Sequence, residues 1–149
     1  MGKLQVSAEQ VIDAPADAVY GYLADMAEHH PRFLPPAFTA FGVESGGIGA
    51  GTITHFTLTA GGRTRRYRME VTEPESGHVL TESDTTSSLV TTFTVTPRAA
   101  SSLVCIETAW DGAGGIGGFF ERLFAPRVMR SLYLDELKRL NTYARERAS

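Results

Sequence analysis

The sequence contains a single cysteine, Cys105, among 149 residues. One cysteine cannot form an intrachain disulfide, and it cannot supply the several thiolates of a cysteine-built zinc site. No apolar run approaches the roughly 20 residues that span a bilayer, and residues 1–11 lack the apolar stretch of a secretory signal. The formal net charge of −3 argues against general nucleic-acid binding, which usually shows as a large positive excess. We therefore expect a cytoplasmic protein with neither a nucleic-acid partner nor integral membrane contact.

The composition is that of an ordinary globular protein. Hydrophobic residues make up 42% of the sequence and charged residues 21%. A chain of this length buries about two-thirds of its unfolded surface, which is enough for a real core. We expect one domain over residues 1–149, rather than a disordered or fibrous chain.

The first half of the pattern is a strand, one or two short helices and then many strands. Residues 3–12 are compatible with a strand. In residues 13–26, Pro15 suits a first helical position, and apolar side chains recur at helical spacing from Val19 to Met26. Residues 29–31 belong to a short second helix or turn. Six strands rich in Thr, Val, Phe and Tyr are expected over residues 38–44, 52–60, 64–73, 78–84, 89–96 and 102–110. Their short connections predict an antiparallel sheet.

The last part of the chain is predicted to be one amphipathic helix over residues 116–147 that covers the sheet. Pro126 should kink or break this helix near Ala125. A strand, two short helices, six strands and a long helix make an α+β fold, in which a curved sheet has its helices on one face.

The segments IDAPADAVYGYLADM (12–26), HPRFLP (30–35), GVESGGIGAGT (42–52) and TTFTVTP (91–97), with the terminal helix containing Pro126, resemble the START-like, helix-grip (SRPBCC) superfamily. Within it, the chain is most similar to the polyketide cyclase/dehydrase and lipid-transport type. The resemblance implies a seven-stranded antiparallel sheet wrapped around the final helix, enclosing a deep apolar cavity. It also implies either carriage of a hydrophobic molecule or catalysis of cyclisation or dehydration, and the fold alone does not choose between the two.

Strand alternation and the helical arc together predict the lining of such a cavity. On the sheet side the expected lining is Phe56, Leu58, Tyr67, Met69, Phe93, Val95, Ile106 and Trp110. On the helix side it is Phe119, Leu123, Tyr133 and Leu137. The alternative is that these residues simply fill a closed core.

Charged residues offer candidates for a polar end of the cavity. Arg65 shares the inner phase of its strand with Tyr67 and could bind a carboxylate or phosphate at the rim, or lie at a hairpin tip in water. Arg130 lies on the apolar arc of the helix, so it needs a partner or must reach solvent. We hypothesise that Arg130, Tyr133 and Glu82 form the polar end; the alternative is that the proline kink turns Arg130 to the surface.

Other motifs favour no further chemistry. The four histidines show no His-x-x-x-His spacing, so we expect surface histidines and no metal. His55 would enter the cavity only if the strand phase were shifted by one residue. Gly112, Gly114 and Gly117 match G-x-G-x-x-G, but no second strand follows the helix, so no dinucleotide cofactor is expected.

The sequence therefore leaves three functions open. The first is binding of a small hydrophobic or amphipathic ligand beneath the C-terminal helix, by a monomer or homodimer without cofactors. The second is a polyketide cyclase/dehydrase-like enzyme that uses Tyr67, Arg130, Tyr133 or Glu82 for acid–base chemistry. The third is a protein-interaction module with a closed core.

Overall fold

The computed structural model describes residues 3–111 and 115–148, and the side chains of residues 115–125 lie outside this description. In chain order the elements are β1 (Lys3–Ile12), α1 (Ala16–Ala24), the 3-10 helix η1 (His30–Phe33), β2 (Phe38–Ser45), β3 (Ile53–Ala60), β4 (Arg63–Glu75), β5 (Val79–Asp84), β6 (Val90–Arg98), β7 (Ser101–Asp111) and α2 (Gly115–Ala148). Each predicted strand is present, with small differences at its ends.

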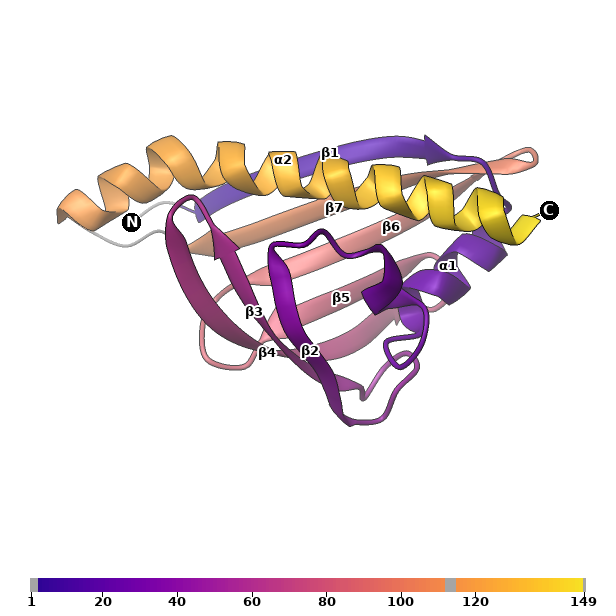
Figure 1. The fold of residues 1–149 in the computed structure, drawn as a ribbon, viewed down its shortest axis with the longest axis horizontal. Helices are drawn as coiled ribbons and strands as arrows, with labels where there is room; N and C mark the ends of the chain where they lie inside the picture. Colours follow the sequence, from indigo (N-terminus) through magenta and orange to yellow (C-terminus); the bar gives the residue numbers. More distant parts are fainter. Residues whose placement is uncertain (1–2, 112–114, 149) are drawn as a thin grey trace.

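The strands form one antiparallel sheet in the order β1-β7-β6-β5-β4-β3-β2. Each of β2 to β7 pairs with its neighbour in sequence, and β1 joins the sheet by pairing with β7. The sheet curves, and α2 runs along its concave side next to β1 (Figure 1). This confirms the predicted α+β helix-grip fold, with two short helices after the first strand.

The long helix α2 continues through Pro126 as one element, so the helix is not broken there. A proline inside a helix removes one backbone hydrogen bond. The helix packs against β1 along the sheet. Within residues 3–111 and 115–148, no helix is both long enough and apolar enough to cross a bilayer.

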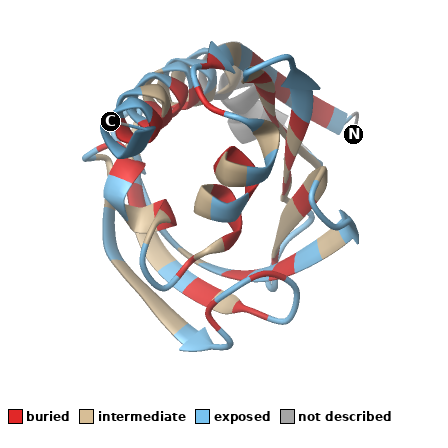
Figure 2. Ribbon diagram, turned by 90° about the vertical axis from the view of Figure 1, so that its right-hand side faces the viewer, coloured by how far each residue is buried: buried red, intermediate tan, exposed pale blue. Residues whose placement is uncertain are grey.

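The core lies between the concave face of the sheet and the helices. Buried residues alternate with exposed residues along most of β1 and with half-buried residues along β6 and β7, as the strand phases predict. Figure 2 shows the change of burial along the ribbon. From the helices, α1 contributes Val19 and Leu23, and α2 contributes Leu137 and Leu140, all fully or almost fully buried. Burial of one such side chain stabilises the fold by roughly 1.5–3 kcal/mol.

The glycine-rich loop between β2 and β3 is fixed to the end of α1. The Gly49 amide donates to the Ala24 carbonyl (2.9 Å), and the Ala50 amide donates to Glu73 Oε1 on β4 (2.8 Å). Gly49 has φ +69°, and a Cβ there would lie 2.5 Å from Glu73 Oε1. Glycine is favoured at this position, because other residues rarely adopt this backbone conformation and a side chain would collide with the Glu73 carboxylate.

Candidate functional site

A cavity opens between the concave face of the sheet and α2. Its volume is about 40 Å³, and the whole depression, counted out to its open mouth, holds about 530 Å³ of space without atoms. Pockets for small organic ligands measure about 300–1,000 Å³. A ligand of that size must therefore occupy the mouth as well as the interior. The lining residues are His30, Leu34, Phe38, Phe41, Phe56, Leu58, Tyr67, Met69, Glu82, Leu89, Thr91, Phe93, Met129, Tyr133 and Glu136.

Aromatic rings form the wall on the side of β2, β3 and β4. Phe56 on β3 lies 5.4 Å, between ring centroids, from Phe38 on β2 and 5.4 Å from its cross-strand partner Tyr67 on β4. Phe41 stacks on Phe56 at 6.4 Å. Such a wall offers flat apolar surface to a ligand.

The predicted lining residues divide between this cavity and the packed core. Phe56, Leu58, Tyr67, Met69, Phe93, Tyr133 and Glu82 line the cavity. Val95, Ile106 and Leu137 are fully buried in the core, and Trp110 packs against it partly buried. The side chains of Phe119 and Leu123 lie outside the description, as do Gly112 and Gly114 of the predicted glycine motif, whereas Gly117 belongs to α2. Contacts between any of these residues and a ligand stay predictions.

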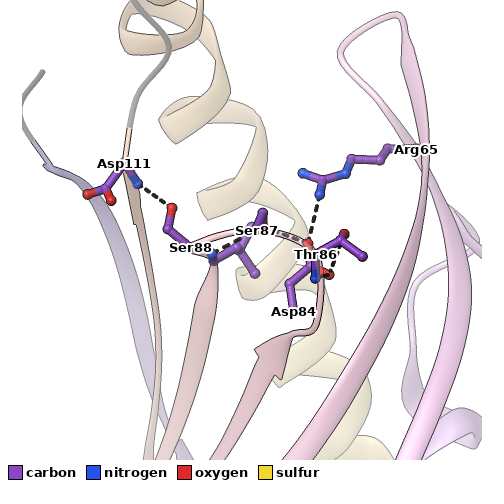
Figure 3. Close-up of polar contacts among 7 residues, drawn as sticks. Arg65, Asp84, Thr86, Ser87, Ser88 and Asp111 are labelled. Carbon is purple, nitrogen blue, oxygen red and sulfur yellow. Dashed lines mark hydrogen bonds and ion pairs between the residues drawn. The ribbon is translucent and has the colours of Figure 1, made fainter.

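Arg65 is not among the residues that line the cavity, and its charge is already paired. Its Nη2 donates to Oδ2 of the buried Asp84 at 2.7 Å, and its guanidinium lies 4.5 Å from the centre of the Tyr67 ring. Figure 3 shows Arg65 reaching from β4 to the turn between β5 and β6, where Ser87 Oγ also donates to Asp84 at 2.6 Å. This turn is joined to the end of β7, because the Asp111 amide donates to Ser88 Oγ at 2.8 Å.

Arg130 and His55 both lie on exposed faces. Arg130 Nε donates to the Ser7 carbonyl on β1 at 3.3 Å, and the residue is not part of the cavity wall. His55 is exposed on β3 with its ring against Gly42, so the strand phase is the expected one. Arg130 therefore lies on the surface, as the second of the two alternatives predicted, and not at the polar end of the cavity. Pro126 nevertheless leaves α2 unbroken.

Three hydroxyl groups form a chain at the inner end of the cavity. Tyr133 of α2 is hydrogen-bonded through its OH to Thr108 Oγ1 on β7, which is 2.7 Å from Thr91 Oγ1 on β6. Burial raises the pKa of Tyr133 well above its ordinary value, although the two threonine hydroxyls lower it and the charges of Glu136 and Glu82 raise it. Tyr133 is therefore a neutral phenol that can donate or accept a hydrogen bond.

His30 is buried, in contrast to the surface position predicted for it. Its Nδ1 donates to the Leu23 carbonyl at the end of α1 (2.7 Å), and its Nε2 lies 3.5 Å from Oε2 of Glu136 on α2. Burial lowers the pKa of His30, but the Glu136 carboxylate, the charge of Glu82 and the Leu23 carbonyl outweigh it and raise the pKa to about 9. The imidazole is thus protonated at neutral pH.

Two carboxylates accompany this cation in the cavity wall. Glu136 is 3% exposed, and its Oε2 has no hydrogen-bond partner among the described residues. Burial raises the pKa of Glu82 to about 7, with the charge of His30 opposing the shift and that of Glu136 adding to it. Glu82 can therefore both release and accept a proton near neutral pH, as a general acid or base requires.

Sequence reasoning identified Glu82 and Tyr133 but missed His30 and Glu136. The signals were present. Glu136 lies between Tyr133 and Leu140 at helical spacings of three and four, inside the apolar arc. His30 follows Met26 by four residues and precedes Phe33 by three, and both neighbours are buried.

The other reactive side chains form no comparable site. Within the described residues, potential metal-ligating atoms of Asp25, Glu28 and His29 lie within 4.8 Å of one another. Asp25 Oδ1 there accepts from two backbone amides, and His29 Nδ1 is bonded to the Tyr143 hydroxyl. Burial raises the pKa of Cys105, with Glu9 and Glu107 adding to the shift, which suppresses thiolate chemistry.

Comparison with known proteins adds a family and several structures. The sequence profile of the family described as polyketide cyclase / dehydrase and lipid transport matches residues 3–145. Among curated proteins, none matches the sequence. The solution structure of the KanY protein is 34% identical over 97% of this chain and 99% of its own, with a TM-score of 0.86.

Two enzymes share the fold at lower identity. The Zhui aromatase/cyclase from Streptomyces sp. R1128 is 15% identical over 99% of this chain and 97% of its own, with a TM-score of 0.80. Norcoclaurine synthase from Thalictrum flavum is 18% identical over 99% and 98% of the two chains, with a TM-score of 0.77. At these identities the likeness extends to the fold alone.

Proposed function

The chain belongs to the polyketide cyclase / dehydrase and lipid transport family, and from this premise we propose that it binds a small hydrophobic or amphipathic ligand in the cavity between the sheet and α2. The proposal treats residues 1–149 as one ligand-binding domain. It keeps two expectations from the sequence, a cytoplasmic location and the absence of a nucleic-acid partner.

One observation carries this proposal: the open cavity has an aromatic wall on one side and buried polar groups at its inner end. A closed interaction module would fill this space with side chains. A ligand with an apolar body and one polar group matches such a surface, because the body gains free energy from burial while the polar group finds partners.

The test is a titration of the protein with 1-naphthalenemethanol, a neutral probe with an apolar body. Binding is measured by calorimetry and by the chemical shifts of the backbone amides. Leu89 lines the cavity and is half-buried, so Leu89→Trp should fill the mouth and weaken binding about tenfold or more. Leu134→Trp is the matched control, because Leu134 lies on the exposed side of α2 at 40% exposure. Equal binding by both variants, or no binding by the wild type, would contradict the proposal.

A second candidate function is favoured by Glu82. A carboxyl group with a pKa of about 7 in an apolar cavity is suited to take the α-proton of a bound ketone, leaving an enolate that the neutral Tyr133 phenol can stabilise with its O–H. This is the cyclase/dehydrase-like alternative.

The assay for this alternative is deuterium exchange at the α-carbon of 2-tetralone, followed by NMR. Exchange faster than in buffer, lost in Glu82→Gln and kept in the exposed control Glu70→Gln, would support catalysis. A wild-type rate equal to that of buffer would leave ligand binding as the proposed function.

A further inference from the structure

Glu136 places an unsatisfied carboxylate oxygen in the wall of the cavity. Its side chain is 4% exposed, and Oε2 lacks a hydrogen-bond partner among the described residues. The nearest cation in the cluster, His30 Nε2, is 3.5 Å away, beyond the usual range of about 2.7–3.2 Å for N–H···O bonds. A buried carboxylate oxygen without a donor costs free energy, and a ligand that supplies the donor recovers it.

The charge at this end of the cavity is also unbalanced. His30 supplies one positive charge, whereas Glu136 and Glu82 supply two negative charges when both are ionised. Arg65 does not correct this, because the buried carboxylate of Asp84 already pairs with it. A cationic group would balance the cluster, and an anionic group would be repelled by it.

We propose that the inner end of the cavity binds a protonated primary amine carried on an aromatic or other apolar body, with the Glu136 carboxylate as its acceptor. This rests on the ligand-binding function proposed above and names the ligand class for the same cavity.

The surroundings fit an ammonium group in two further ways. An ammonium has three N–H donors, and the wall offers oxygen acceptors from Glu136, Glu82 and Thr91. The wall also contains the aromatic ring of Phe93, and aromatic rings attract cations. A neutral alcohol could satisfy one oxygen but would leave the charge unbalanced.

The test compares three probes with one aromatic body: 1-naphthylmethylamine, 1-naphthalenemethanol and 1-naphthoate. We expect the amine to bind about tenfold or more tightly than the alcohol, since a charge-assisted hydrogen bond forms inside the cavity, and the carboxylate to bind most weakly. An alcohol that binds as tightly as the amine would overturn the amine proposal and leave ligand binding intact. If no probe binds, the proposed function itself fails, and the amine proposal with it.

Variants on α2 then assign the preference to a residue. Glu136→Gln should bring the affinities for amine and alcohol to within about twofold of each other, because the acceptor charge is lost. Asp135→Asn is the matched control, since Asp135 is a neighbouring acid that pairs with Arg139 on the outer surface. A preference for the amine that survives Glu136→Gln would contradict the role of Glu136.

A pH series on the wild-type protein gives the same answer without a variant. The titratable groups that face Glu82 are His30 from η1 and Glu136 and Tyr133 from α2, while its cross-strand partners on β4 and β6 carry none. From about pH 6 to about pH 8 His30 and the amine stay protonated and Glu82 ionises, so the amine should bind severalfold more tightly as the pH rises. The alcohol should show no such change, and a pH-independent affinity for the amine would count against the proposal.

Discussion

His30 is protonated inside the folded protein at neutral pH, and this should make the free energy of unfolding depend on pH. The pKa of His30 is raised to about 9 from the ordinary value of 6.5. A raised histidine pKa means that the native state holds a proton that the unfolded state releases. The stabilisation is therefore complete below about pH 6.5 and is lost as the pH rises through about 9.

The size of the effect follows from proton linkage. While the native state holds one more proton than the unfolded state, the free energy of unfolding falls by about 1.4 kcal/mol for each pH unit. The raised pKa of Glu82 has the same sign, but its contribution is lost as the pH rises from about 4.5 to about 7. Between about pH 7.5 and about pH 9, where the native His30 becomes half deprotonated, His30 should itself contribute a fall of about 1.5 kcal/mol.

Urea denaturation over this pH range measures the fall, and NMR of the imidazole measures the pKa directly. His30→Gln keeps a donor for the Leu23 carbonyl but carries no charge, so it should remove the His30 part of the slope. His55→Gln is the matched control, because His55 is exposed on β3. Cys105, whose pKa is raised as well, contributes to the pH dependence of the free energy of unfolding in both proteins. Its contribution cancels when the slope of the variant is subtracted from that of the wild type. A wild-type slope equal to that of His30→Gln would refute the buried imidazolium.

Two further predictions concern the contacts that hold the glycine-rich loop. Tyr20→Phe should lower the free energy of unfolding by about 1–3 kcal/mol, because it removes the hydrogen bond of 2.6 Å from the Tyr20 hydroxyl to Glu73. Urea denaturation measures this loss. The control Tyr22→Phe should change the free energy of unfolding little, and equal losses in both variants would contradict the role of Glu73. Gly49→Ala should lower the melting temperature, because its φ of +69° and the Glu73 carboxylate at 2.5 Å leave no room for a methyl group. Gly21→Ala, in the helix α1 with nothing within 4 Å of the added carbon, should raise it, and a drop in both variants would argue against the strain.

Much of the fold could be predicted because each element carries its own period. Every second residue of β6 from Thr91 to Val95 and of β7 from Ser102 to Thr108 is buried, and α2 repeats its buried apolar residues at helical spacing. The continuity of α2 through Pro126 could not be judged from local sequence, since tertiary context can override a local propensity.

The polar end of the cavity was only partly predictable. Thr91 and Thr108 share the inner phase of their strands with Phe93 and Ile106, so their inward direction follows from alternation. The pairing of His30 with Glu136 joins residues more than a hundred positions apart, and it depends on how η1 is placed beneath α2. No local pattern indicates that these two residues lie close together. A histidine followed by proline is as typical of a surface turn as of a buried position.

The polar cluster is difficult to explain by stability alone. Removing His30, Glu136 and Glu82 from water costs several kcal/mol for each charge, and well-packed apolar residues often stabilise a fold as much as a buried ion pair does. The unpartnered Oε2 of Glu136 leaves part of that cost unrecovered. All three residues line the cavity, and none lies in the part of the core that is closed to it. A fold that needed only a closed interior could place leucine or phenylalanine at these positions. The cost is explained if a ligand supplies the missing donor, and the amine titration tests that explanation directly.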